Sequence, residues 1–373
     1  MNINTFLRIL LFMTLHTLSQ AQQFKPQTIV SIKGEDFYIN GTITLQGKTY
    51  GGMRLEGLLP NSRMVQGIFD DANPKTRHHW QFPDSMAWDP ERNTNEFVAA
   101  MEDWRASGLL AITLNLQGGN PFGYGANQPW INTAFKSDGS LDPAYMARLD
   151  KILRRADQLG MVVILGYFYF GQDQHLKDEK AVKNGVRLAT KWILNKGFRH
   201  VIIEINNECD INDIVRGNNV APYDHTILDS KRVHELISMA QSIQKKKNRL
   251  LVSTSFIGGT LPTDEVLKIS DYLLIHGNGV SKIQRITEMV QTLRKNKNYK
   301  GVPIVFNEDD HFDFEKTENN FIAATREHAS WGYFDYRMKD EGFDEGYQSV
   351  PVNWKISSER KRGFFGLLKE MTK

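Results

Sequence analysis

Two apolar segments of the sequence end in the same pair of residues, an asparagine followed by a glutamate. Glu208 closes the segment 201–208, and Glu308 lies near the end of the segment 303–309. Two carboxyl groups in one cleft can work as an acid and a base, because different surroundings keep one protonated and the other ionised. Glu208 and Glu308 are therefore a candidate catalytic pair, provided that the fold brings the two segments together.

The rest of the sequence alternates short apolar strands with amphipathic helices. Strands are expected at 52–58, 109–117, 162–170, 201–208, 249–256, 271–278, 303–309 and 332–337. Helices are expected at 93–107, 143–159, 178–196, 229–247, 263–269, 281–297, 316–330 and 358–371. Runs such as 161–165 are apolar throughout, which is typical of parallel strands covered on both faces. Eight strand–helix units predict an α/β fold, a closed (β/α)8 TIM barrel.

The main competing fold is an open, doubly wound sheet. That fold usually has a glycine-rich turn after its first strand, where phosphate binds. Here the first expected strand runs into Leu-Leu-Pro-Asn at 58–61, which offers no such turn. The closed barrel is therefore the preferred prediction.

A closed barrel would place both glutamates at one site. Barrel enzymes carry their catalytic groups at the carboxyl ends of the strands, and Glu208 and Glu308 end the fourth and seventh expected strands. These two strands face each other across part of the rim, so their terminal side chains can converge. Two carboxyl groups about 5–5.5 Å apart serve retaining glycosidases, in which one protonates the leaving oxygen and the other attacks the anomeric carbon.

These motifs give the chain a resemblance to the superfamily of retaining (β/α)8 glycosidases that contains β-galactosidases, cellulases and mannanases. The matching residues are Ile-Asn-Asn-Glu at 205–208 and Ile-Val-Phe-Asn-Glu at 304–308, and the resemblance covers the barrel at 51–371. The resemblance implies that Glu208 is the acid/base, that Glu308 is the nucleophile, and that Asn207 contacts the sugar 2-hydroxyl. It indicates no subfamily and no particular sugar.

Further substrate-binding residues are expected at the ends of other strands. His276 ends strand six, where the resemblance implies a Tyr or His that touches the nucleophile; a purely structural histidine is the alternative. The resemblance implies an arginine near the start of the barrel that supports the nucleophile, a role that Arg54 on strand one could fill; a buried pair with Glu56 is an equally good account of Arg54. Asn115 on strand two is expected to point into the barrel.

Aromatic side chains near the strand ends are expected to stack on the apolar faces of sugar rings. Tyr167 on strand three and Trp354 in the loop after strand eight are selected for this role. The resemblance favours Trp354, because the superfamily often has a tryptophan after strand eight. Core packing is the alternative for aromatic residues of this kind.

The run Asp309-Asp310-His311 suggests a second hypothesis, a metal-dependent barrel hydrolase that also uses His276. Carboxylates beside a histidine can bind a divalent cation. Such hydrolases usually have His-x-His on strand one, where this chain has Arg-Leu-Glu at 54–56. We therefore expect no metal and no cofactor. A third hypothesis is a carbohydrate-binding barrel without catalysis, against which the presence of both glutamates argues.

The N-terminal residues resemble an export signal. Arg8 precedes an apolar run at 9–15 and small residues up to Ala21, and the run is too short to cross a bilayer. We expect cleavage after Ala21, a secreted or periplasmic protein, and no membrane anchor. Residues 22–50 are expected to form a β-hairpin region packed on a barrel at 51–373.

The composition excludes several other classes of protein. The chain has 46 Lys and Arg against 43 Asp and Glu, and its formal charge of +3 lacks the basic excess of a nucleic-acid-binding protein. Its one cysteine, Cys209, excludes intrachain disulfides, and no motif ties a histidine to it as a catalytic partner. A carbohydrate is therefore the expected partner, and the oligomeric state has no signature in the sequence.

Overall fold

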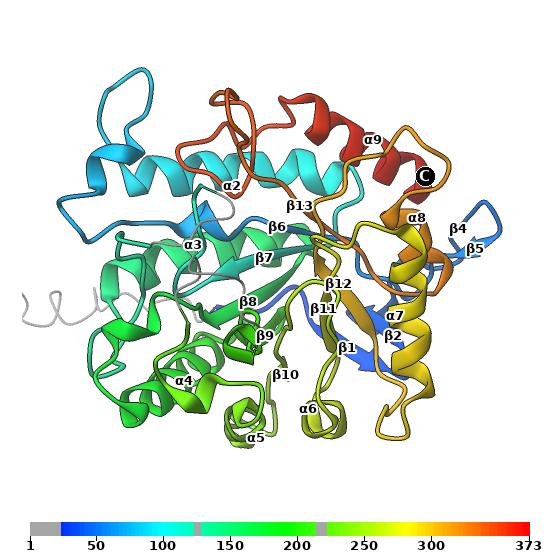
Figure 1. Ribbon diagram of the computed structural model, residues 1–373, viewed down its shortest axis with the longest axis horizontal. Coiled ribbons are helices and arrows are strands. Elements are labelled where there is room, and N and C mark those ends of the chain that lie inside the picture. Colours follow the sequence, from blue (N-terminus) through cyan, green and yellow to red (C-terminus); the bar gives the residue numbers. More distant parts are fainter. Residues whose placement is uncertain (1–23, 123–127, 214–221) are drawn as a thin grey trace, which may run out of the picture.

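The computed structural model describes residues 24–122, 128–213 and 222–373 (Figure 1). The predicted export signal at 1–21 lies outside these residues. Within the described ranges, every helix is too short or too polar to cross a membrane.

Eight parallel strands form a closed barrel. In chain order they are β6 (Asn61–Arg63), β7 (Ala111–Asn115), β8 (Val162–Phe168), β9 (Val201–Asn206), β10 (Leu251–Ser253), β11 (Leu273–His276), β12 (Ile304–Glu308) and β13 (Gly332–Phe334). Hydrogen bonds join six of them in the order β10-β9-β8-β7-β6-β13, and β11 pairs with β12. Backbone bonds from Phe306 to Ser330 and from Asp271 to Val252 connect the two groups. The predicted (β/α)8 barrel is confirmed.

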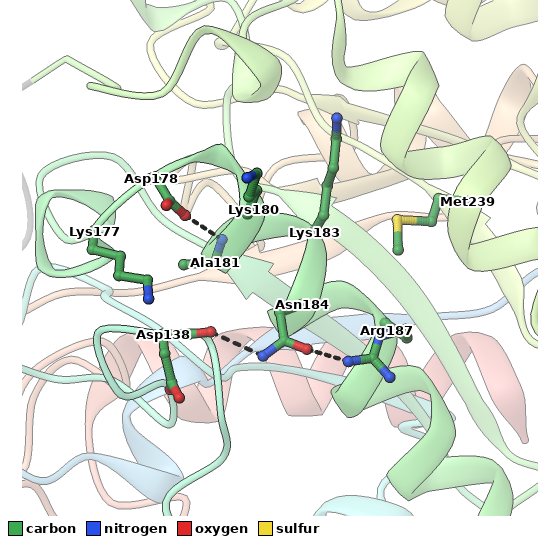
Figure 2. A pocket seen from close by; sticks show the side chains of 9 residues that line it. All are labelled: Asp138, Lys177, Asp178, Lys180, Ala181, Lys183, Asn184, Arg187 and Met239. Carbon is green, nitrogen blue, oxygen red and sulfur yellow. Dashed lines mark hydrogen bonds between the residues drawn. The ribbon is translucent and has the colours of Figure 1, made fainter.

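Helices surround the strands, and local sequence sets where they begin and end. The α-helices are α2 (Pro90–Ala106), α3 (Pro143–Leu159), α4 (Glu179–Lys196), α5 (Val233–Ser242), α6 (Asp264–Ile269), α7 (Ile283–Lys295), α8 (Asn320–Arg326) and α9 (Glu359–Thr372). Short 3-10 helices lie in the loops: η1 (Val65–Ile68), η2 (Arg77–Trp80), η3 (Asp173–His175), η4 (Ile211–Asp213) and η6 (Thr226–Leu228). Asp142 caps the start of α3, and Gly160, with a φ of 69°, ends it. Asp178 caps α4 in the same way (Figure 2).

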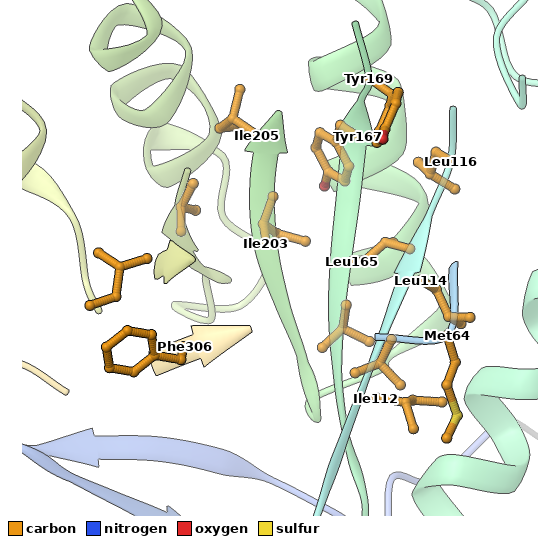
Figure 3. Packing of buried hydrophobic residues seen from close by; sticks show 14 of the residues in the cluster. Met64, Ile112, Leu114, Leu116, Leu165, Tyr167, Tyr169, Ile203, Ile205 and Phe306 are labelled. Atoms are coloured by element: carbon orange, nitrogen blue, oxygen red, sulfur yellow. The ribbon is translucent and has the colours of Figure 1, made fainter. Parts of the chain in front are cut away.

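Alternate side chains of the strands enter two separate apolar cores. Leu114, Leu165 and Ile203 belong to the layer between the strands and the helices (Figure 3). Val162 and Ile164, of the opposite parity, fill the inside of the barrel. This alternation follows from the two-residue period of a β-strand. Because both faces are covered, the strands are apolar throughout, as the sequence indicated.

A small antiparallel sheet closes the amino end of the barrel. It consists of β1 (Val30–Lys33), β2 (Asp36–Ile39) and β3 (Thr42–Ile43). Phe37 on β2 is fully buried and joins the interior core with Leu59 and Tyr272, which precede β6 and β11. The predicted N-terminal hairpin region is therefore present, and it leaves the carboxyl ends of the strands open for chemistry.

The strand expected at 52–58 is wrong. Those residues instead contribute β5 (Met53–Arg54), which pairs with β4 (Thr49–Tyr50) in a separate antiparallel hairpin. The predicted division between hairpin region and barrel at residue 50 falls inside this hairpin and remains a prediction.

The true first strand of the barrel, β6, was missed because its residues are polar. All three of them are buried, and the barrel satisfies two of them by hydrogen bonds. The Asn61 amide donates to the Phe306 carbonyl at 3.1 Å, and the Ser62 hydroxyl donates to the Tyr333 carbonyl at 3.1 Å. A buried polar strand is stable only when such partners exist, and a single sequence does not show them.

Candidate active site

Glu208 and Glu308 meet at one point on the rim of the barrel. Glu208 follows β9 and Glu308 ends β12, and both residues are buried. His276, at the end of β11, contacts both: its Nδ1 is 3.2 Å from Oε1 of Glu208 and 3.7 Å from Oε2 of Glu308. One atom from each of the three side chains lies within 4.8 Å of the other two. The two sequence motifs therefore belong to a single site.

The backbone of Glu208 adopts an uncommon conformation. Its φ of 50° lies in the left-handed region, which residues other than glycine rarely adopt. Ser255 holds it there: the Glu208 N–H donates to Ser255 Oγ at 3.0 Å, and the Cys209 N–H donates to the Ser255 carbonyl at 3.0 Å. Backbone strain of this kind is concentrated at active sites, where it aims a side chain at a ligand.

Glu308 is held by two side chains from other strands. Nε of Arg63, on β6, lies 2.8 Å from Oε2, and Nδ2 of Asn278, after β11, donates to Oε1 at 3.0 Å. Burial raises the pKa of Glu308 above its ordinary value, although the positive charges of Arg63 and His276 oppose that rise. The carboxylate is thus both fixed in place and kept basic.

The charge of His276 is governed by the two glutamates. Burial by itself lowers the pKa of an imidazole, but the negative charges of Glu308 and Glu208 outweigh it and raise the pKa of His276 above its ordinary value. The raised pKa favours the charged form of the ring, which lies beside both carboxyl groups. On its other side, Nε2 has no hydrogen-bond partner among the described residues and is available to a ligand.

The two asparagines before Glu208 have different surroundings. Asn206 serves the fold, because its Nδ2 donates to a backbone carbonyl and its Oδ1 accepts from Thr254 at 2.9 Å. Asn207 is buried, and its Oδ1 has no partner in the described part of the chain. Asn115 also lies inside the barrel, with neither polar side-chain atom bonded to a described residue. Asn207 and Asn115 therefore keep polar atoms that a ligand could use.

Arg54 does not lie at the site, so the role predicted for it is wrong. It sits on the β4–β5 hairpin, is half exposed, and pairs with Asp36 at 2.9 Å. Asp36 belongs to β2 in the sheet that closes the amino end of the barrel. The error follows from the misplaced first strand, since Arg63 on β6 occupies the position that Arg54 was expected to fill.

The two aromatic residues selected for sugar stacking also lie elsewhere. Tyr167 faces outward, with its hydroxyl 3.0 Å from the Thr190 hydroxyl of α4. Trp354 is buried against α2: its Nε1 donates to Asn93 Oδ1 at 3.0 Å and its ring packs on Phe97. Both predictions are wrong for the same reason, because large aromatic side chains gain more from apolar surface under the helices than from an open cleft.

Three residues around the glutamates were not among the expected site residues. Arg63 lies in a strand too polar to be recognised, and Asn278 is the last residue of the strand expected at 271–278, where His276 was selected instead. Tyr169 follows the end of β8 (Figure 3). Burial raises the pKa of its hydroxyl and the negative charge of Glu308 raises it further, so the hydroxyl keeps its proton.

The residues of the metal hypothesis fall into two separate clusters. His276 groups with the two glutamates, whereas Asp309, Asp310 and His311 form a group of their own. Asp309 is already engaged, because Trp331 Nε1 and Asn320 Nδ2 both donate to its Oδ2 at 2.9 Å. These bonds give Asp309 a structural task in the loop after β12.

A hollow lies on the outside of the barrel (Figure 2). Its volume is about 480 Å³, and it is formed by the first half of α4 together with Asp138 and Met239. Lys177, Lys180 and Lys183 give it a positive character. Neither glutamate of the pair lines it, so it is distinct from the candidate active site.

Comparisons with known proteins agree with the architecture. No protein-family model and no curated protein matches the sequence, but many solved structures match the fold. An endo-1,4-beta-mannanase from Rhizomucor miehei shares 12% identity with a TM-score of 0.55, over 92% of this chain and 99% of that one. A GH5-4 broad specificity endoglucanase from Bacteroides salanitronis shares 10% identity with a TM-score of 0.54, over 84% and 93%.

A third example is a GH5 family lichenase from Caldicellulosiruptor sp. F32, with 14% identity, a TM-score of 0.53 and coverage of 85% of this chain and 93% of that one. Similarity at this level of identity concerns the whole barrel and not individual side chains. The chain therefore has the (β/α)8 fold found in these glycoside hydrolases, over nearly its full described length.

Proposed function

We propose that this protein is a retaining glycoside hydrolase that cleaves β-linked glycosidic bonds in a polysaccharide or oligosaccharide. The observation that carries the proposal is the buried cluster of Glu208, His276 and Glu308, whose contacting atoms lie within 4.8 Å of one another. Inverting enzymes keep their carboxyl groups about 6.5–9.5 Å apart to admit a water molecule, whereas retaining enzymes need about 5–5.5 Å. The spacing here favours the retaining reaction.

In the first step Glu308 attacks the anomeric carbon as a carboxylate and forms a glycosyl ester, while Glu208 gives its proton to the departing glycosidic oxygen. In the second step Glu208, now ionised, takes a proton from water, the water oxygen bonds to the anomeric carbon, and Glu308 leaves as a carboxylate. Arg63 and Asn278 fit the role of orienting Glu308 in both steps, because they contact its two oxygens from different sides.

The remaining polar groups of the site fit the same reaction. The His276 ring lies against both carboxyl groups, and its charged form, which its raised pKa favours, stabilises the ionised form of Glu308. The unbonded Oδ1 of Asn207 is placed next to Glu208 in the chain and fits a contact with the sugar 2-hydroxyl, which strengthens in the transition state.

The fold supports the substrate class, and the sequence supports the location. The similar structures include an endo-1,4-beta-mannanase, an endoglucanase and a lichenase, so β-linked polysaccharides are the substrates to test first. The signal-like residues 1–21 favour export, and we propose that the mature protein works outside the cytoplasm, secreted or periplasmic.

The test uses Glu308→Ala and Glu208→Ala, assayed on β-mannan, β-glucan and 4-nitrophenyl β-glycosides, with and without azide. Azide replaces the missing nucleophile in Glu308→Ala, so the product should be a glycosyl azide of inverted configuration. In Glu208→Ala azide should attack the glycosyl ester and yield the azide of retained configuration. Glu102→Ala, which removes an exposed carboxylate on α2, is the matched control and should keep wild-type activity.

Each alternative function predicts a different result. Wild-type activity in both glutamate variants would overturn the proposal. Loss of wild-type activity on addition of a chelator would favour the metal-dependent hydrolase. Binding of a polysaccharide without any cleavage, across the whole panel, would favour a carbohydrate-binding barrel.

A further inference from the structure

Glu204 is a third buried glutamate of the site, and the proposed reaction does not use it. It lies on β9, four residues before Glu208, and its side chain is fully buried. Gly166, the next residue across the sheet, leaves room for Asn115 and for Glu204: a Cβ added there would lie 2.2 Å from Asn115 Oδ1 and 3.3 Å from Glu204 Oε2. A carboxylate is costly to bury, so it needs a partner inside the barrel.

That partner is Arg63, which Glu204 shares with Glu308. Arg63 is 1% exposed. Its Nε lies 2.8 Å from Glu308 Oε2, and its Nη1 lies 3.9 Å from Glu204 Oε2. The guanidinium therefore has one carboxylate at each of two different nitrogens. Its terminal nitrogens make no hydrogen bond to the described residues, so the two carboxylates are its principal fixed partners.

Glu204 also reaches the chain directly beside Glu308. Nδ2 of Asn307 donates to Glu204 Oε1 at 3.5 Å, and Asn307 immediately precedes Glu308 on β12. Oε2 of Glu204 thus faces Arg63, which orients Glu308, and Oε1 faces Asn307, the residue before Glu308 on β12. A group with no part in positioning Glu308 would not be expected to contact both.

We propose that Glu204 is a positioning residue for Glu308. It pairs with Arg63 from the opposite side, so that the guanidinium orients the nucleophile while its positive charge is shared between two carboxylates. This inference rests on the proposed function, because it presumes that Glu308 is the nucleophile. An arginine whose only partner is Glu308 would bind that carboxylate more tightly and make it a weaker nucleophile, since a nearby positive charge stabilises the ionised form.

The charged and titratable groups that act on Glu308 come from several elements. They are Arg63 from β6, Tyr169 after β8, Glu204 and Glu208 from β9 and its end, and His276 from β11. Glu204 acts in two ways that have the same sign: its own negative charge raises the pKa of Glu308, and its hold on Arg63 limits the opposing effect of the guanidinium. Removal of its charge should therefore lower the pKa of Glu308.

The test compares Glu204→Gln, which keeps the shape and removes the charge, with Glu204→Asp, which keeps the charge and shortens the side chain. On the 4-nitrophenyl β-glycoside that wild type cleaves best, Glu204→Gln should lower kcat by about ten-fold or more, the effect of disturbing one hydrogen-bonded charge, with little change in KM. The acidic limb of its kcat/KM profile should move to lower pH. Glu204→Asp should recover part of kcat and leave that limb near its wild-type position.

A readout that does not need activity separates the inference from the proposed function. The side-chain carboxyl of Glu308 can be titrated by carbon NMR in protein labelled at the glutamate carboxyl carbon, with Glu308→Gln to assign the signal. The pKa should fall in Glu204→Gln even if the wild-type protein cleaves no glycoside, a result that would overturn only the proposed function. Asp157→Asn, at a buried carboxylate that holds Gln27 and Thr28, is the control: it should lower the melting temperature and leave the Glu308 titration unchanged.

An unchanged Glu308 titration together with wild-type kcat in folded Glu204→Gln would overturn the inference. If Glu204→Gln does not fold, Glu204→Asp decides: a lowered kcat at unchanged KM supports the positioning role, and wild-type kcat with an unchanged Glu308 titration refutes it.

Discussion

At the scale of single residues, two arginines show how strongly the surroundings decide the role of one residue type. Arg63 is buried with Glu308 and Glu204, whereas Arg54 is half exposed and paired with Asp36. A guanidinium presents several donors in a fixed plane, which a lysine ammonium cannot reproduce at a buried site. An exposed ion pair contributes only about 0–1 kcal/mol to stability.

Arg63→Lys should therefore reduce kcat/KM by about ten-fold or more, since a hydrogen bond or ion pair to a buried charge contributes about 1.5–3 kcal/mol. Arg54→Lys, the matched control, should change neither activity nor the free energy of unfolding by a measurable amount. Steady-state kinetics and urea unfolding of both variants make the comparison. Equal effects of the two substitutions would show that Arg63 has no special link to Glu308.

Asn278 is the second residue whose effect can be predicted from one contact. Its Nδ2 donates to Glu308 Oε1 at 3.0 Å, and a hydrogen bond to the ionised form of an acid lowers its pKa. Asn278→Ala removes this bond, so the acidic limb of the kcat/KM profile should move to higher pH and kcat should fall. Asn184→Ala, which removes a partly exposed amide on α4, away from the glutamates (Figure 2), should move neither. A shift of the acidic limb to lower pH in Asn278→Ala would contradict the inference that the Asn278 hydrogen bond stabilises the ionised form of Glu308.

At the scale of elements, helices were easier to predict than strands because their ends carry chemical signals. The helix expected at 143–159 has those bounds in the structure, since Asp142 and Gly160 mark its two ends. The first barrel strand had no such signal. Its three residues are polar, and what stabilises them is the carbonyl groups and carboxylate of strands far away in the sequence.

The long connection between β13 and α9 is held to the barrel by a buried tryptophan. It returns Trp354 to α2, where the ring lies 4.8 Å from Phe97 and is buried. Trp354→Ala should lower the free energy of unfolding by about 3–5 kcal/mol, the usual effect of emptying a buried aromatic site. Protein that remains folded should keep its wild-type KM, because the ring packs in the core.

The control for this element is Trp192→Ala, at a tryptophan of α4 that is only partly buried, which should cost less stability. Chemical unfolding and substrate titration of both variants measure the two effects. A raised KM in folded Trp354→Ala would indicate that Trp354 contributes to substrate binding and would contradict a role in core packing alone.

At the scale of the whole molecule, the barrel was predictable because its evidence is repeated. Eight strand–helix units carry the same pattern, so the error in the first strand did not alter the architecture or the convergence of Glu208 and Glu308. The buried residues around the pair, Arg63 and Glu204, were less predictable. Arg63 and Glu204 stabilise each other only once the barrel has closed, and a contact between residues so distant in sequence has no local pattern.

Closure of the barrel buries Glu308, so the folded state loses stability at pH values where this carboxyl is ionised. Burial raises the pKa of Glu308 in the folded chain above its unfolded value, so the folded state binds the proton more tightly. Such a group contributes stability that is fully present below its unfolded pKa and is lost as pH rises through its folded pKa. Glu308→Gln carries no titrating group at this position and avoids that loss.

Melting temperatures of wild type and Glu308→Gln should therefore differ least at acidic pH, where the Glu308 carboxyl is protonated in the folded and the unfolded chain, and should diverge in favour of Glu308→Gln as pH rises toward 8. The variant would be the more stable and the less active protein, as expected where a site trades stability for function. Glu102→Gln, at a side chain that is 71% exposed, is the control and should follow wild type at every pH. A wild type that becomes the more stable protein with rising pH would mean that Arg63, Asn278 and His276 overcompensate the burial of Glu308, so that the ionised carboxylate is held without cost to the fold.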